Sequence, residues 1–440
     1  MVEGTPERDV MAMDVARFGD WISPGYTLPK VVENYQKRFS VSYPNEELAA
    51  ARPLRTTPMY DIFSQLGAVW GQQYGLEVAN YFAQGDEPTF ETPTFRRSDA
   101  FAAVAREVAG VRGGVGINEV QNFGKYLVTG VEARSWLDWI MAGRIPSVGR
   151  MALTPMLSEN GKLIGDFTIS CLDDQTFQLT ASYGAQAFHM RWFTQHAIGS
   201  VQVKNISDIR TGFQIAGPLA KDVLKACTLR DVDSMRFLDV HNMTVGMVNC
   251  LVQRVSYTGD LGYEIYCDTL DQRSLWQSLW AAGKTHDMVP FGMRAMMSLR
   301  LDKFFGSWMS EYSPDYTAAE TGLERFIDFK KDVEFIGRAV AEADREKGPS
   351  RTLCAFEVDS IDADVHGYEP IWHDGSVVGF CTSGGYSHFA DKSIALGFVP
   401  TGSDREGLRV EIEILGIMCP ARLIKDPLFD ADGARMRGLS

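Results

Sequence analysis

The pattern of apolar residues changes after Arg351, and this change limits most strongly which folds the chain can adopt. Beyond it, short runs of apolar and β-branched residues alternate with turns rich in Gly, Asp and Ser. That rhythm predicts a small all-β barrel or jelly roll. The expected strands are Leu353–Val358, Gly367–Ile371, Val377–Cys381, Ser393–Pro400 and Arg409–Ile414.

The residues before Arg351 mix hairpins with helices. Apolar residues recur at helical spacing from Ser98 to Val111, which predicts a helix there. Glu159-Asn160-Gly161-Lys162 has the residues of a tight hairpin turn. This mixture indicates an α+β fold rather than a doubly wound parallel sheet. The elements expected here are helices at Ser98–Val111, Ser135–Met141 and Arg273–Ala282, and a hairpin over Met151–Ser170.

The N-terminal residues are expected to form an arm outside the main folds. Prolines interrupt this stretch, and a helix is predicted from Lys30 to Arg38 with Tyr35 and Phe39 as its anchors. A linker follows at 51–58, because residues that precede a proline prefer extended backbone. A chain of 440 residues exceeds what one hydrophobic core usually serves, so we expect two or three domains.

Charge and composition exclude several classes of function. The net charge of -14 disfavours a nucleic-acid partner, because such binding relies on basic patches. No run approaches the ~20 apolar residues that a membrane span needs, and the first residues lack the apolar core of a signal peptide. We therefore expect a cytoplasmic protein without a membrane partner. The seven cysteines are scattered, which predicts buried free thiols rather than a zinc or disulfide framework.

Familiar cofactor and catalytic motifs are missing from the sequence. Gly113-Gly114-Val115-Gly116 suggests a dinucleotide loop, but the G-x-G-x-x-G spacing would need glycine where the chain has Glu119. P-loop, zinc-protease and serine-hydrolase motifs are also absent. His189 and His196 have no carboxylate or cysteine neighbours, so we expect structural histidines and no metal site.

Three segments place charged residues inside apolar elements. Asp166 lies in a strand, where a carboxylate costs free energy unless it is paired or functional, although an edge or turn position would also explain it. Glu264 lies in the aromatic strand Tyr263–Tyr266, where it could simply face solvent. Arg300 lies in an apolar helix, and its default role is an ion pair on the helix surface with Asp302 or Glu311.

Together and in this order, the three segments resemble the aminomethyltransferase (T-protein) family of the glycine cleavage system. Residues from about Arg52 to Arg437 are also similar to the folate-dependent half of dimethylglycine and sarcosine dehydrogenases. The arm from Asp14 to Pro44 resembles the tail of the flavin domain of those enzymes, and the Gly-rich nucleotide fingerprint of that domain is not in the sequence. Other stretches with this similarity are Phe335-Ile336-Gly337-Arg338, Thr382-Ser383-Gly384-Gly385-Tyr386 and Asp426-Pro427-Leu428-Phe429.

The resemblance implies a three-lobed ring with tetrahydrofolate as cofactor in a central channel. Asp166 matches the catalytic aspartate of the family, and Thr168 matches a polar contact beside it. Tyr257 and Glu264 match residues that hold the pterin, and a carboxylate suits that task because it accepts two parallel N–H donors. Arg300 would either join helix and strand or reach a carboxylate of folate or substrate. The implied regions are an arm at 1–52, two α+β lobes at 53–345 and a C-terminal β-barrel at 346–440.

The chain departs from the family at two places. Where relatives have an Asp-x-Ser stretch, this chain has Asn118, Glu119 and Asn122, which we expect near the substrate side. This difference leaves the identity of the methyl donor open. The stretch Lys331–Arg338 lacks the cysteine of relatives that assist iron–sulfur assembly, which weakens a non-enzymatic interpretation.

The expected activity is transfer of a one-carbon unit from a small methylated amine, betaine, sulfonium or methoxy donor to tetrahydrofolate. Direct methyl transfer, which we favour, would depend on alignment and exclusion of water. Alternatively, a separate flavoprotein subunit oxidises a methylamine and the chain forms methylenetetrahydrofolate, with Asp166 directing proton transfers. A non-catalytic folate-binding module is the remaining alternative.

Overall fold

The first α+β lobe is a five-stranded antiparallel sheet with helices on its outer face. In order across the sheet, the strands are β5 (Met151–Leu157), β6 (Leu163–Asp173), β7 (Thr176–Ser182), β4 (Phe123–Thr129) and β8 (Gln202–Asn205). The computed structural model describes residues 10–15, 19 and 21–439, and in it β5 and β6 form the predicted hairpin. The outer helices are α4 (Ala133–Ile140) and α5 (Gln186–Gln195). Trp136 and Phe193 from these helices pack into the core of this lobe.

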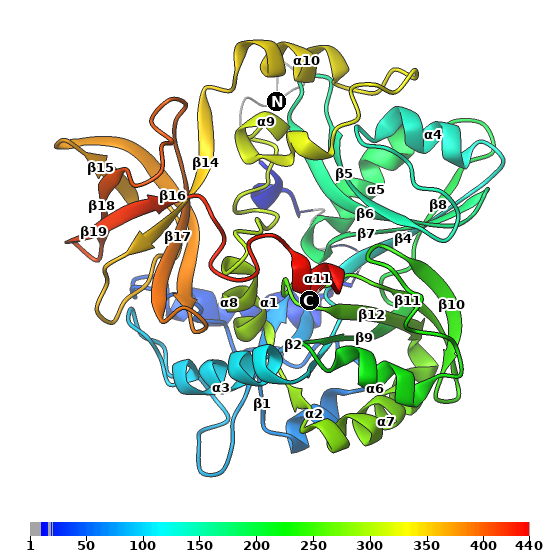
Figure 1. Ribbon diagram of the computed structural model, residues 1–440. Coiled ribbons are helices and arrows are strands. Elements are labelled where there is room, and N and C mark those ends of the chain that lie inside the picture. Colours follow the sequence, from blue (N-terminus) through cyan, green and yellow to red (C-terminus); the bar gives the residue numbers. More distant parts are fainter. Residues whose placement is uncertain (1–9, 16–18, 20, 440) are drawn as a thin grey trace.

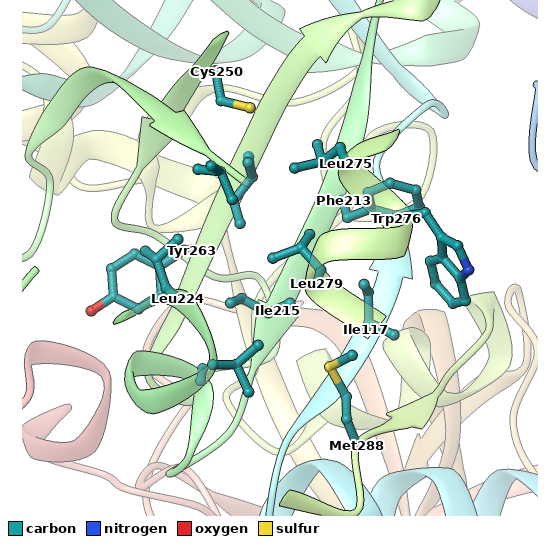
Figure 2. Packing of buried hydrophobic residues seen from close by; sticks show 14 of the residues in the cluster. Ile117, Phe213, Ile215, Leu224, Cys250, Tyr263, Leu275, Trp276, Leu279 and Met288 are labelled. Atoms are coloured by element: carbon teal, nitrogen blue, oxygen red, sulfur yellow. The ribbon is translucent and has the colours of Figure 1, made fainter. Parts of the chain in front are cut away.

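The second lobe is built on a six-stranded mixed sheet. In order, its strands are β10 (Val240–Val245), β11 (Val248–Gln253), β12 (Gly262–Asp268), β9 (Arg210–Ala216), β3 (Gly116–Glu119) and β13 (Val289–Pro290). Its outer helices are α2 (Tyr60–Gln65), α6 (Ala220–Cys227) and α7 (Gln272–Gly283). Figure 2 shows the core between sheet and helices, where Leu275, Trp276 and Leu279 of α7 meet Phe213 and Ile215 of β9. The predicted helix at Arg273–Ala282 is thus confirmed.

The inner faces of the two sheets meet in the middle of the molecule. An apolar cluster joins them and combines Met151 from β5 with Leu251 from β11 and Tyr266 from β12. A hydrogen bond also crosses the junction, because Gln253 Nε2 donates to Ser170 Oγ over 3.0 Å. The polar residues that share these inner faces are therefore enclosed between two sheets.

The C-terminal strands close into a barrel, so the barrel prediction is confirmed and the jelly roll is excluded. In order around the barrel, the strands are β14 (Arg351–Val358), β17 (Lys392–Pro400), β16 (Ser376–Ser387), β15 (Pro370–His373), β18 (Arg409–Ile414) and β19 (Ile417–Ile424). The sequence-based prediction missed β19, which contains Pro420, a residue that usually argues against a strand. Cys419, Ala421 and Leu423 nevertheless alternate into the barrel core.

Shorter elements connect these units. The hairpin of β1 (Ala68–Gln73) and β2 (Leu76–Phe82) packs with α3 (Ala100–Gly113) and α8 (Met293–Leu301). The remaining α-helices are α9 (Ala318–Thr321), α10 (Arg338–Lys347) and α11 (Ala434–Arg437). The 3-10 helices are Met11–Met13, Tyr183–Ala185, Thr269–Asp271, Lys284–His286 and Leu323–Phe326. The proposed domain boundary between 345 and 346 falls in the last turn of α10.

The three units form a three-lobed α+β structure, as the fold prediction states. The barrel lies beside both lobes, and α11 lies between them near the centre of the view (Figure 1). Among the described residues, no helix is both long and apolar enough to cross a membrane. Six of the seven cysteines are buried.

The helix of the N-terminal arm differs from its prediction. α1 spans Pro24–Gln36, beginning earlier than Lys30, because Pro24 takes the first helical turn where its missing N–H is no loss. The expected anchors do not anchor it, since Tyr35 is 64% exposed and Phe39 97% exposed. The arm therefore presents an apolar surface outward.

Candidate active site

Asp166 lies on an inner strand of the first lobe. Its strand β6 has β5 on one side and β7 on the other; Asp166 itself is paired with Pro155 of β5, and the pairing with β7 begins two residues later, at Thr168. Burial raises the pKa of its carboxyl from 3.8 to about 7. Burial raises the pKa of Tyr257 and of Tyr312, and the charge of Asp166 adds to the rise at both hydroxyls, so Asp166 is within electrostatic reach of each tyrosine. A carboxyl with this pKa can hold or release a proton near neutral pH.

Tyr257 and Tyr312 are positioned by the loop between α8 and α9. The hydroxyl of Tyr257 donates to Gly306 O over 2.6 Å, and its ring stacks on Phe305 with centroids 6.0 Å apart. The ring of Tyr312 lies against Gly306, where a Cβ would come within 2.5 Å of it. Sequence reasoning missed Gly306 and Tyr312, because a loop residue without charge or motif gives no local signal.

Glu264 lies on the inner face of the second sheet, on β12. Only 9% of this residue is exposed, so a solvated position is excluded. The hydroxyl of Tyr266 donates to Glu264 Oε2 over 2.7 Å. Burial raises the pKa of Glu264 to about 7, against the opposing effects of Tyr266 and the positive charge of Lys125.

Lys125 is a buried cation beside Glu264 that sequence reasoning also missed. Its Nζ donates to Gln121 O over 3.2 Å and to Phe123 O over 3.0 Å. It lies 5.9 Å from the centroid of the Tyr266 ring. Burial lowers the pKa of Lys125 to about 7, while the charges of Asp208, Glu119 and Glu264 raise it. The charges of Lys125 and Glu264 therefore stabilise each other inside the junction between the sheets.

Thr168 shares the inner face of the first sheet with Asp166, two residues before it on β6. It pairs with Thr180 on β7, which pairs in turn with Lys125 on β4. Residues that lie directly opposite on neighbouring strands share one face. Thr168, Thr180 and Lys125 therefore form a polar row opposite the sheet that contains Glu264.

Arg300 on α8 is buried within the protein and does not lie on the helix surface. Its guanidinium pairs with Glu311 at 3.1 Å and donates to Phe305 O and Ser383 Oγ, each over 2.8 Å. Asp302, the other expected partner, pairs instead with Arg112 at 2.7 Å. These contacts support the role of joining α8 to the barrel rather than contact with a ligand.

The residues expected on the substrate side separate in the structure. Glu119 shares the outer face of β3 with Ile117 and accepts a hydrogen bond from Gln272 Nε2 over 2.5 Å, so the sheet separates it from Glu264. Asn122 donates to Gln73 Oε1 over 3.4 Å, toward the β1–β2 hairpin. Only Asn118 shares the inner face with Glu264.

A cavity of about 340 Å³ lies beside this region, between α3, α8 and the barrel. Its arginines are paired with acids, Arg97 with Asp364 and Arg294 with Glu91, each at 2.8 Å. Their charges are thus neutralised within the protein. In the described part of the chain, no group of three or more His, Cys, Asp or Glu side chains is arranged to hold a metal ion.

Three family models match the chain. The GCVT N-terminal domain matches residues 59–331, and the glycine cleavage T-protein C-terminal barrel domain matches residues 351–430. The FAD dependent oxidoreductase central domain matches residues 3–57. The first two matches correspond to the lobes and the barrel, and the third falls on the arm.

Individual relatives agree with these matches. Mitochondrial dimethylglycine dehydrogenase of Mus musculus is 33% identical over 443 residues, which is 99% of this chain and 51% of that protein. The chain thus spans about half the length of this relative. Aminomethyltransferase of Geobacillus sp. (strain WCH70) is 28% identical over 86% of this chain and 99% of that protein.

A solved structure agrees at the level of the fold. Aminomethyltransferase T of the glycine cleavage system from Bartonella henselae superposes with a TM-score of 0.75 at 21% identity, covering 86% of this chain and 99% of that one. The predicted resemblance is therefore confirmed by domains, relatives and fold together. The chain belongs to the glycine cleavage T-protein family.

Proposed function

We propose that this chain transfers a one-carbon unit from a small methylated donor to tetrahydrofolate, between the inner faces of its two sheets. One observation supports this proposal above the others. The half-buried Asp166 and the buried Glu264 belong to the opposed inner faces of the two lobes, and desolvation raises the pKa of each carboxyl to about 7. A site with one carboxyl for proton transfer and another for ligand binding suits chemistry at the nitrogen atoms of a reduced pterin.

The residues present fit that ligand. Glu264 Oε1 accepts no hydrogen bond within the described residues, and Gln214 nearby has a buried side-chain oxygen without a donor. Such acceptors match the N–H groups of a pterin ring. Tetrahydrofolate would supply the nitrogen atoms that receive the one-carbon unit. Glu264 would orient the ring, the aromatic ring of Tyr257 would exclude water, and Asp166 would exchange a proton beside it.

A second candidate function is that of the folate-binding half of a flavin-dependent dehydrogenase. The match of residues 3–57 to an FAD oxidoreductase domain favours it. The apolar face of α1 favours it too, since Leu28 is 66% exposed and Phe39 beyond the helix is 97% exposed. An FAD-binding partner covering this face would oxidise the donor, and this chain would capture the product.

An anaerobic assay tests both candidates. The purified chain is mixed with tetrahydrofolate and, in turn, dimethylglycine, sarcosine, glycine betaine, dimethylsulfoniopropionate or a methoxy-aromatic compound, and folate products are identified by mass spectrometry. Methyltetrahydrofolate formed without added flavoprotein supports direct transfer. Methylenetetrahydrofolate formed only with an added amine-oxidising flavoprotein supports the second candidate. Binding of tetrahydrofolate without any product in either condition would contradict both and leave a non-catalytic module.

Asp166→Asn is the matched variant for this assay. It keeps the size of the side chain and removes the titratable group, so tetrahydrofolate binding should persist while turnover falls. Loss of binding with unchanged turnover per bound ligand would contradict the role of Asp166 in proton transfer.

A further inference from the structure

A row of four polar side chains crosses the inner face of the second sheet. Asn118 on β3 pairs with Gln214 on β9, Gln214 pairs with Glu264 on β12, and Glu264 pairs with Gln253 on β11. Directly opposite residues share a face, and neighbouring strands lie about 4.8 Å apart. All four are nearly or fully buried, with at most 9% exposed. The row is therefore enclosed and regular.

Asn118, at one end of the row, fixes the orientation of the Gln214 side-chain amide. Asn118 Nδ2 donates to Phe291 O over 2.6 Å, and because a carbonyl only accepts, the oxygen of the Asn118 amide must point the other way. Gln214 Nε2 approaches that oxygen at 3.5 Å. The reverse orientation of Gln214 would place two carbonyl oxygens against each other. Gln214 Oε1 consequently points away from Asn118.

This orientation leaves an acceptor without a donor. Gln214 is 1% exposed, and its Oε1 has no hydrogen-bond partner within the described residues. A buried carbonyl of this kind destabilises the fold and is uncommon without a function. Gln253 Oε1, beyond Glu264, is unpartnered too, but the amide of Gln253 is held against the first sheet by Ser170.

Gln214 lies on the side of Glu264 that faces Tyr257 and Asp166. Its amide is 3.9 Å from Met296 Sδ on α8, and Tyr257 packs against the same apolar cluster as Met296. Tyr257 is in electrostatic reach of Asp166. A ligand between Asp166 and Glu264 would therefore extend along Gln214 rather than along Gln253.

The acceptors define the chemistry of the ligand edge that they meet. Glu264 can take two parallel N–H donors, which a pterin offers as its ring N–H and one hydrogen of its 2-amino group. The second hydrogen of that amino group points outward from this pair. We propose, on the basis of the proposed function, that Gln214 accepts this hydrogen and that Asn118 is the positioning residue that orients it. Gln214 thus makes the site specific for a ring with an amino group.

The experiment compares two ligands in the full-length chain. Gln214→Met keeps the length of the side chain and removes the amide, and Gln253→Met is its matched control at the other side of Glu264. Dissociation constants are measured anaerobically by calorimetry for tetrahydrofolate and for an analogue with a methyl group in place of the 2-amino group. Gln214→Met should bind tetrahydrofolate about tenfold more weakly than wild type, but should bind the analogue as wild type does. Gln253→Met should match wild type for both ligands.

Two results would overturn the assignment of Gln214. One is equal affinity of Gln214→Met and wild type for tetrahydrofolate, and the other is equal weakening for both ligands, as a purely structural role predicts. A wild-type chain that binds no tetrahydrofolate would instead refute the proposed function itself. If Gln214→Met does not fold, Asn118→Leu decides the question, because loss of the orienting contact should weaken tetrahydrofolate selectively and an unselective effect would refute the proposal.

Discussion

At the scale of single residues, the carboxyl of Asp166 lowers the free energy of unfolding by an amount that depends on pH. The unfolded carboxyl ionises near 3.8 and the folded one near 7, so between these values the unfolded chain releases a proton that the folded chain keeps. Raising the pH through this window therefore favours unfolding, and the full cost is present above about pH 7. Below 3.8 both states are protonated and the cost disappears.

Replacing Asp166 by Asn should consequently stabilise the protein at alkaline pH. We expect Asp166→Asn to raise the free energy of unfolding at pH 8 by about 1 kcal/mol or more, and the gain should shrink steadily toward pH 5. Urea unfolding at several pH values, followed by tryptophan fluorescence, measures this difference. A gain that does not depend on pH would mean that the pKa of the Asp166 carboxyl is not raised in the folded chain.

Glu264 provides the second test at this scale. Glu264→Gln keeps the side-chain length and the contact with Tyr266 but places an N–H₂ group opposite N–H donors. Affinity for tetrahydrofolate should fall by about 1.5–3 kcal/mol, the range for a hydrogen bond to a charged group. Tyr266→Phe, which removes only the supporting hydroxyl, is the control and should cost less. Unchanged affinity of Glu264→Gln in calorimetry would remove Glu264 from the ligand site.

Asp166 and Glu264 could be singled out from the sequence, whereas Gln214 and Lys125 could not. Asp166 and Glu264 stand out because a carboxylate in an apolar strand costs free energy. Gln214 does not, since its place beside Glu264 depends on the pairing of β9 with β12, strands far apart in the sequence. Lys125 belongs to no motif in the sequence, so only the fold shows that its ammonium is buried.

At the scale of elements, the loop between α8 and α9 depends on one glycine. A Cβ on Gly306 would lie 2.5 Å from the Tyr312 ring, and this tyrosine is only 8% exposed. Gly306→Ala should therefore displace Tyr312 and lower the free energy of unfolding by about 1–3 kcal/mol, as for overpacking elsewhere. Equilibrium urea unfolding measures the loss.

Two further variants show whether the clash is the cause. Adding Tyr312→Leu to Gly306→Ala should recover part of the loss, which additive effects would not do. Gly113→Ala, at a helix position where a Cβ meets nothing within 4 Å, should leave stability unchanged or slightly higher. If the double variant is as unstable as the sum of the single ones, the loop is not constrained by this contact.

Helices and strands were predicted correctly where the apolar residues follow a single helical or alternating pattern. The helix at Ser98–Val111 and the strand Arg409–Ile414 correspond to α3 and β18 within two residues. Proline misled the prediction of one helix and of one strand. Pro24 and Pro29 lie inside α1, which was predicted to begin only at Lys30, and Pro420 lies inside β19, which was not predicted. The restrictions that proline puts on the backbone can be read from the sequence. Whether a proline occupies a position that tolerates them, at the end of a helix or on an outward-facing side, depends on the tertiary fold.

At the scale of the whole molecule, Arg300 and Glu311 hold the barrel against the lobes. Arg300 comes from α8, and Glu311 accepts hydrogen bonds from Thr382 and Ser383 of β16, each over 2.6 Å. Neither member of the pair is exposed. Removing one partner of such a pair leaves an uncompensated buried charge, whereas replacing both by apolar residues restores much of the stability.

This difference separates the two roles that the sequence left open for Arg300. Glu311→Leu should lower the free energy of unfolding by about 3–5 kcal/mol, and adding Arg300→Met should recover most of it. Because the Arg300 guanidinium contacts groups of the protein and not the ligand, the double variant should also bind tetrahydrofolate with wild-type affinity. Urea unfolding and calorimetry on the same samples measure both quantities. A stable double variant that no longer binds tetrahydrofolate would show instead that Arg300 serves the ligand, and that the joint between barrel and lobes lies elsewhere.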